Sequence, residues 1–263
     1  MERYDEDIEY LKLVSEMPSS FERELSGISM RRLNLDDPLR YYNTHTTITN
    51  VDYGVIDPVF IANRLFDTTF RAMYDDRISS IEFLDYSHEN HNIRTYRIRF
   101  NRLKRSFSRC YKDREAIVDC YFKYISPNEV ILLYQTNENH EKAYPHMNDV
   151  VRVVYHRPSG VIIRKYGAKC IATFIETINP GGSLSHKALK KIELTDWIND
   201  QIKLRDAICD MYQSQVVSTT YSMKIFLSSQ SASAIGSPSF STKEEITTRK
   251  RSRLQEAQAA AAA

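Results

Sequence analysis

The stretch from Val150 to about Tyr212 constrains the fold more than any other part of the chain. It holds two segments of alternating apolar residues around a predicted turn at Arg157-Pro158-Ser159-Gly160, a third that ends at Asn179-Pro180-Gly181-Gly182, and then a long run with helical spacing. Alternation with a period of two predicts strands, whereas recurrence every three to four residues predicts a helix. This order predicts a curved antiparallel sheet that is closed by a C-terminal helix lying across its face.

The segments that precede this stretch fit the same architecture. Residues 3–16 place apolar side chains at helical spacing and predict an amphipathic helix that ends near Pro18. Asp57-Pro58 predicts the start of a second helix that runs to Met73, because Pro is favoured in a first helical turn. Strands are predicted over residues 28–35, 39–53, 79–86, 92–100, 113–126, 129–137, 149–157, 160–167 and 168–178.

Several motifs follow one another in an order that is typical of one protein family. Phe70-Arg71-Ala72-Met73-Tyr74-Asp75-Asp76, followed by Ile81-Glu82-Phe83-Leu84, resembles a helix that ends in an aromatic-Asp pair before a strand. Lys112-Asp113, Val150-Val151-Arg152 and the segment Thr173 to Gly182 resemble three later strands of that family, the last with a double-glycine turn. Over residues 1–213 the chain is thus similar to the START domain, the steroidogenic-acute-regulatory-related lipid-transfer module of the helix-grip, or Bet v 1-like, superfamily.

The resemblance implies an α+β helix-grip fold, a curved antiparallel sheet around a long C-terminal helix with an internal apolar cavity. The function that it implies is non-enzymatic binding of a hydrophobic lipid, such as a sterol or a phospholipid, for transfer between membranes or for sensing. We expect the cavity to be gated by the C-terminal helix and by the loop at residues 101–112. After the double glycine the family often has a large apolar residue and Pro, where this chain has Ser183-Leu184-Ser185.

The candidate cavity residues lie on the predicted strands and on the first part of the closing helix. Small residues such as Ala172 leave room between larger ones. Tyr134, Tyr155, Arg152 and Asp119 are the polar candidates for anchoring a headgroup or a hydroxyl, although strand parity alone does not decide which of them point inward. The expected lining is Val118, Cys120, Phe122, Tyr134, Arg152, Val153, Tyr155, Ala172, Phe174, Leu184, Ala188, Leu189 and Ile192.

The loop at residues 101–112 interleaves basic and apolar side chains. Cations beside exposed aromatic rings suit an anionic membrane surface, where each cation contributes about 1 kcal/mol. The alternative is a solvated loop whose apolar residues fold back onto the sheet. The candidates for membrane contact are Arg102, Leu103, Lys104, Arg105 and Phe107.

Charge and cysteine content argue against several other classes of protein. The formal net charge is +2, but residues 214–263 carry six basic against three acidic residues, so the remainder is near neutral, unlike most nucleic-acid-binding domains. The four cysteines lie far apart without metal-ligand spacing, which predicts reduced thiols and no metal site. A charged N-terminus and the lack of a stretch of about 20 apolar residues predict a cytoplasmic monomer, peripheral at membranes, without a cofactor.

Residues 214–263 have a different composition from residues 1–213. They are rich in Ser and Thr, and such a segment cannot bury enough apolar area to offset the entropy of ordering, which predicts a disordered tail. An alternative role follows from Ser237-Pro238 and Ser252 as phosphorylation sites. The basic residues that would direct nuclear import or contact acidic lipids are Arg249, Lys250, Arg251 and Arg253.

Three functions from different classes therefore compete. A lipid carrier or sensor leads, and a ligand-free protein-interaction module with the same fold comes second. An enzyme of the wider superfamily comes third, because the chain lacks G-x-S-x-G, a Gly-rich phosphate loop and H-E-x-x-H, and His88 and His91 have no third ligand nearby. A cavity of several hundred Å³ favours the first function, a packed interior the second, and a cluster of convergent titratable groups the third.

Overall fold

A computed structural model describes residues 2–33, 44–75, 78–87, 90–100, 113–136, 139, 143–145, 150–181 and 197–233. The chain divides into two compact units, Met1–Ser214 and Gln215–Ala263. The helices are α1 (Glu2–Glu16), α2 (Pro58–Phe66), α3 (Thr68–Tyr74) and α6 (Ile198–Ser233). The strands are β1 (Ser20–Leu25), β2 (Ile28–Leu33), β3 (His45–Asp52), β4 (Ile78–Ser87), β5 (Asn90–Phe100), β6 (Asp113–Ser126), β7 (Glu129–Gln135), β8 (Val150–Arg152), β9 (Val154–Tyr166) and β10 (Lys169–Asn179).

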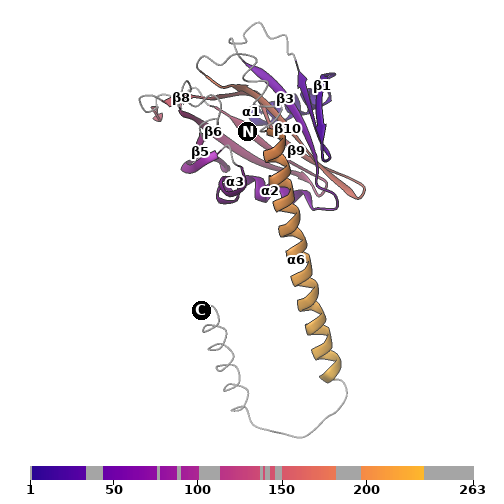
Figure 1. Cartoon of the computed structure of the whole chain (residues 1–263). Helices are drawn as coiled ribbons and strands as arrows, with labels where there is room; N and C mark the ends of the chain where they lie inside the picture. The colour runs from indigo at the N-terminus through magenta and orange to yellow at the C-terminus, as the bar shows by residue number, and fades with distance from the viewer. Residues whose placement is uncertain are drawn as a thin grey trace. The chain divides into compact units, whose positions relative to one another are not determined.

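The strands form one 10-stranded sheet in the order β1-β2-β3-β10-β9-β7-β6-β5-β4 (Figure 1). Neighbours along this path are antiparallel, and the short β8 pairs with β6 in parallel. The pairing of β3 with β10, from Asp52 opposite Ile171 to His45 opposite Ile178, joins the early and late parts of the chain. The predicted α+β architecture with a large antiparallel sheet is therefore confirmed.

The two faces of the sheet bury different apolar clusters. Because successive side chains of a strand point to opposite faces, Val118 of β6 lies on one face and Tyr121 on the other. On the inner face, Val118 belongs to a cluster that includes residues of α2, α3 and α6. On the outer face, Tyr121 belongs to a cluster with Ile8, Leu11 and Val14 of α1. The helices α1 and α6 thus cover opposite faces of one sheet.

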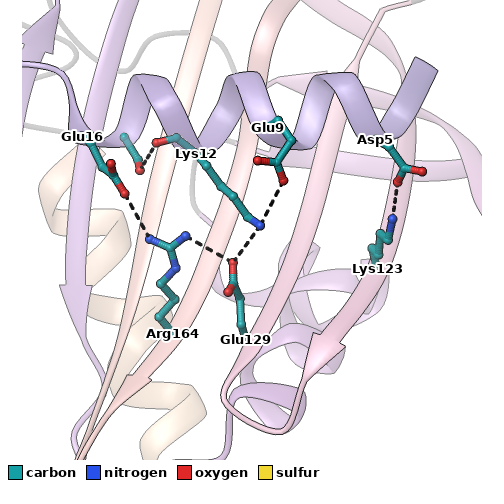
Figure 2. A network of polar contacts seen from close by, with 8 residues as sticks. Asp5, Glu9, Lys12, Glu16, Lys123, Glu129 and Arg164 are labelled. Atoms are coloured by element: carbon teal, nitrogen blue, oxygen red, sulfur yellow. Dashed lines mark hydrogen bonds and ion pairs between the residues drawn. The ribbon is translucent and has the colours of Figure 1, made fainter. Parts of the chain in front are cut away.

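Ion pairs as well as apolar contacts hold α1 on the outer face (Figure 2). Leu11 and Val14 are fully buried, and burial of each such side chain contributes about 1.5–3 kcal/mol. The ion pairs are partly exposed, so each contributes at most about 1 kcal/mol and mainly fixes the orientation of the helix. Between α1 and the sheet they join Lys12 to Glu129 (3.7 Å), Glu16 to Arg164 (3.9 Å) and Asp5 to Lys123; the pairs Lys12–Glu9 (3.2 Å) within α1 and Arg164–Glu129 (3.3 Å) within the sheet extend the network.

The turn predicted at residues 157–160 between two strands is wrong, because β9 runs through this segment. The pairing of β9 with β10 shifts register between Ile175 and Thr177. At the shift, the Ser159 hydroxyl accepts a hydrogen bond from the Thr177 backbone N–H at 2.9 Å. A side chain therefore satisfies a ladder group where Pro158, which has no N–H, interrupts the regular pattern.

The second helix predicted from Asp57 to Met73 is divided into α2 and α3. The Oδ1 atom of Asp67 accepts hydrogen bonds from the backbone N–H groups of Thr69 (3.0 Å) and Phe70 (3.1 Å), so this residue ends α2 and caps α3. Capping satisfies donors that the first helical turn leaves unpaired.

The last helix also differs from the prediction. α6 continues to Ser233, so residues 214–233 of the expected disordered tail are helical, while residues 234–263 lie outside the described part. No Gly or Pro occurs between Gly182 and Gly236, and the sequence therefore offers no strong helix breaker in this range.

Candidate functional site

A small cavity lies on the inner face of the sheet beside the first turns of α6. Its volume is about 20 Å³. Strands from the middle of the sheet form one wall, and residues of α2, α3 and α6 complete it. The lining residues are Leu65, Arg71, Ile98, Val118, Tyr134, Tyr155, Phe174, Glu176, Trp197, Gln201 and Leu204.

The size of this cavity limits what it holds in the observed conformation. A cavity of about 10–15 Å³ is large enough to hold one water molecule, whereas ligand pockets usually measure about 300–1,000 Å³. A cavity of about 20 Å³ therefore has room for one water molecule. A lipid chain fits only after the surrounding elements move.

Trp197 forms part of the cavity wall at the start of α6. Its side chain is buried, and its indole Nε1–H donates a hydrogen bond to Thr49 Oγ1 on β3 at 3.0 Å. Trp197 and Ile198 also pack against Met30 of β2. These contacts attach the first turn of α6 to the inner face of the sheet.

An arginine on α3 introduces a positive charge at the cavity. The Arg71 guanidinium carbon lies 5.7 Å from the centre of the Tyr134 ring, and its Nη2 atom lies 3.8 Å from Oδ2 of the buried Asp75. Burial raises the pKa of Tyr134, although the nearby Arg71 partly opposes this shift by favouring the phenolate. Tyr134 is therefore a neutral phenol that can both donate and accept a hydrogen bond.

Gln201 adds a buried amide on the α6 side of the cavity. The residue is only 2% exposed, and its Oε1 atom has no hydrogen-bond partner among the described residues. The hydroxyl of Tyr53, buried in the same inner cluster, also lacks a partner there, and burial raises its pKa. With Tyr155 of β9 and Glu176 of β10, Gln201 gives the cavity a polar as well as an apolar lining.

The structure brings part of the predicted cavity lining together. Val118, Tyr134, Tyr155 and Phe174 all line the cavity. Cys120, Phe122, Val153 and Ala172 belong to the surrounding inner cluster without lining the cavity itself. Burial raises the pKa of the Cys120 thiol to about 12, so this group is neutral in the core.

Two polar candidates lie on the opposite face of the sheet. Arg152 Nη2 lies 3.3 Å from Glu115 Oε1 and donates to the Tyr144 carbonyl at 2.7 Å, while Asp119 accepts a hydrogen bond from the Thr95 hydroxyl at 2.7 Å. The reason is strand parity: because Val118 points inward, residues 115 and 119 of β6 point outward. The expectation that Arg152 lines the cavity is therefore wrong, and Asp119, whose direction the sequence left open, points to the outer face.

Some predicted residues lie outside the described part of the chain. These are the cavity candidates Leu184, Ala188, Leu189 and Ile192, and the membrane-contact candidates Arg102, Leu103, Lys104, Arg105 and Phe107. Conversely, the sequence prediction missed Arg71, Glu176 and Gln201. It also missed Leu65, Ile98, Trp197 and Leu204, because it placed the cavity side of the closing helix at residues 184–192.

The described residues contain no group of His, Cys, Asp and Glu side chains that could hold a metal ion. Among the helices described here, none has the length and apolar character needed to cross a membrane.

Neither a protein-family profile nor a curated protein sequence matches this chain, but solved structures do. Human STARD10 superposes with a TM-score of 0.66 at 16% identity, covering 86% of this chain and 87% of its own. Human StAR-related lipid transfer protein 5 gives 0.67 at 11% identity, over 80% and 97%. The lipid transfer and protein localization domain of human StarD13 gives 0.57 at 14% identity, over 75% and 92%. The chain therefore has the helix-grip fold of START domains.

Proposed function

We propose that this chain is a non-enzymatic lipid-binding domain that holds its ligand on the inner face of the sheet, beneath α6. The observation that carries this proposal is the polar lining of a cavity inside an apolar core. Arg71, Tyr134, Tyr155, Glu176 and Gln201 converge on the cavity from four different elements and the start of α6. Such convergence of a few polar groups in an apolar concavity is typical of small-molecule sites.

Packing alone gives no reason for this arrangement. A buried polar group that lacks a hydrogen bond destabilises the fold by about 1–3 kcal/mol. An interior that served only as a core would be more stable with an apolar side chain in place of Gln201, whose Oε1 atom has no hydrogen-bond partner among the described residues. Positions where a chain buries a polar group without a hydrogen-bond partner are often functional.

The free energies allow the interior to open. Burial of an 18-carbon chain contributes roughly 14 kcal/mol, at about 0.8 kcal/mol for each methylene. The hydrogen bond from Trp197 to Thr49, which attaches the start of α6, contributes about 0.5–1.5 kcal/mol. A bound chain thus supplies much more free energy than this hydrogen bond.

The names of two structural neighbours support the same class of function, since both contain the words lipid transfer. We extend the proposal to transfer or sensing of lipid at a membrane surface by a cytoplasmic monomer. In this proposal residues 101–112 contact the membrane, through Arg102, Lys104 and Arg105 with Leu103 and Phe107. Residues 1–213 form the lipid-binding domain.

Native mass spectrometry of the purified chain, followed by extraction of any bound lipid, tests this proposal. We expect a stoichiometric lipid on the wild-type chain and loss of that lipid on Val118→Phe, because the larger ring fills the cavity. Val55→Phe is the matched control, since Val55 is 71% exposed and lies outside the cavity lining. If the wild-type chain carries no lipid and takes up none from liposomes, the proposal fails.

A ligand-free interaction module is the second candidate, and the cavity volume of about 20 Å³ favours it. A packed interior needs no ligand, and the fold would then serve only as a surface for another protein. In this case native mass spectrometry would detect no bound lipid on the wild-type chain, on Val118→Phe or on Val55→Phe.

A further inference from the structure

We propose that the interior selects lipids that carry a hydrogen-bond donor, and that Gln201 receives this donor. The inference rests on the proposed function and names the class of lipid: one with a hydroxyl or a similar donor at the end that reaches the interior. Sterols with a free hydroxyl, ceramides, diacylglycerols and fatty alcohols belong to this class. Ethers, esters without a hydroxyl and quaternary ammonium headgroups do not.

The first observation is the state of the Gln201 side chain. It lines the cavity and is only 2% exposed, and its Oε1 atom accepts no hydrogen bond from the described residues. A carbonyl oxygen only accepts hydrogen bonds, so a donor is the group that satisfies it. The cavity has room for one water molecule, and a ligand hydroxyl at the same place can donate to this oxygen.

The second observation concerns the donors that already surround the cavity. Trp197, one turn before Gln201 on α6, uses its Nε1–H in the hydrogen bond to Thr49. Arg71 lies on another element, α3, and its guanidinium lies beside Asp75 at 3.8 Å and over the Tyr134 ring. Because the Gln201 Oε1 atom has no hydrogen-bond partner among the described residues, none of their donors satisfies it, and the ligand is the natural source of one.

A hydroxyl suits this lining better than a group that only accepts hydrogen bonds. It can donate to Gln201 Oε1 and at the same time accept from Arg71 or from a tyrosine hydroxyl. A lipid whose hydroxyl is replaced by a methyl ether can still accept but leaves Gln201 Oε1 unsatisfied. An unsatisfied buried acceptor is unfavourable enough to weaken binding by about tenfold or more.

Paired ligands that differ only in the donor test this inference. The pairs are 1-hexadecanol with its methyl ether, and cholesterol with its methyl ether. Binding to the full chain is followed through the fluorescence of Trp197, which is the one tryptophan in the sequence and lines the cavity. The variants are Gln201→Met, which keeps the length without the acceptor, and Gln201→Glu, which keeps an acceptor. Gln213→Met, at an exposed position of α6, is the matched control.

We expect the wild-type chain and Gln213→Met to bind at least one alcohol about tenfold more tightly than its ether. Gln201→Met should bind both members of that pair equally, and Gln201→Glu should retain the preference. Equal binding by the wild-type chain, or an unchanged preference in Gln201→Met, overturns the inference while lipid binding itself stands. If the wild-type chain binds no lipid of either kind and carries none after purification, the proposed function fails together with it. The wild-type ratio remains decisive if a variant does not fold.

Discussion

Gly160 marks a close approach between the centre of the sheet and α1, and its replacement by alanine gives a quantitative test of the packing. A Cβ atom at this position would lie 2.4 Å from the Leu132 carbonyl oxygen and 3.0 Å from Leu11 Cδ2. Leu132 belongs to β7, which pairs with β6 on one side and β9 on the other, so its carbonyl cannot easily move. To lengthen the contact with Leu132 to 3.0 Å, the backbones must separate by 0.6 Å (3.0 minus 2.4).

We expect Gly160→Ala to lower the free energy of unfolding by about 3 kcal/mol, the upper end of the range for overpacked interiors. Urea denaturation followed through Trp197 fluorescence measures this change, with an unchanged slope against urea concentration. Gly167→Ala is the control: its Cβ would meet nothing within 4 Å, and only its φ of +59° is unfavourable for alanine, by about 1 kcal/mol.

The reasoning is refuted if Gly160→Ala destabilises the chain no more than Gly167→Ala does. Leu11→Ala separates the two close contacts of Gly160. If the Leu132 carbonyl carries the clash, the effects of Gly160→Ala and Leu11→Ala should add to within about 0.5 kcal/mol. If the contact with Leu11 causes the clash, the double variant should lose clearly less stability than the sum of the two single losses.

Three further predictions concern single groups. Tyr53→Phe removes a buried hydroxyl that has no partner among the described residues, so the free energy of unfolding should stay constant or rise by up to about 1 kcal/mol; a loss of stability in thermal unfolding would reveal a hidden partner. Asp67→Ala removes the cap of α3 and should lower the free energy of unfolding by about 1 kcal/mol in urea, whereas no change would mean that the cap is dispensable. Burial raises the pKa of Cys120 from its ordinary value near 9 to about 12, so the folded state keeps a proton that the unfolded state releases. Stability from this group is complete below about pH 9 and falls as the pH rises toward 12; Cys120→Ala should therefore lose less stability than the wild-type chain between pH 8 and 10.5.

The sequence predicted the elements whose pattern is strong. The bounds of β6 agree with the prediction at 113–126, and α1 agrees to within a residue, because both have regular apolar periodicity. β1 was missed, since Ser20–Leu25 is short and mostly polar, and its conformation depends on pairing with β2. Such long-range pairing leaves little trace in the local sequence.

The cavity was predicted only where its lining is apolar or aromatic. Val118 and Phe174 lie in mostly apolar stretches of their strands, which predicted a buried position for both. A polar residue on a helix is expected to be exposed, so Arg71 and Gln201 gave no signal before the fold was known. Arg152 was placed on the wrong face and Asp119 was left undecided, because a side chain's face depends on a register that the sequence alone does not determine.

The contacts around the cavity also indicate where it opens and which ligands open it. The middle strands are paired on both sides, whereas the first turn of α6 rests on Thr49 and Met30 through Trp197 and Ile198. Separating these contacts requires about 1 kcal/mol for the hydrogen bond and about 1.5–3 kcal/mol for each of the side chains of Met30 and Ile198 that becomes exposed, about 4–7 kcal/mol in all. At about 0.8 kcal/mol for each buried methylene, about five to nine methylenes offset this amount. In a series of fatty alcohols, Trp197 fluorescence should therefore change only above about this chain length; a response to much shorter alcohols would show that the interior is open without a ligand.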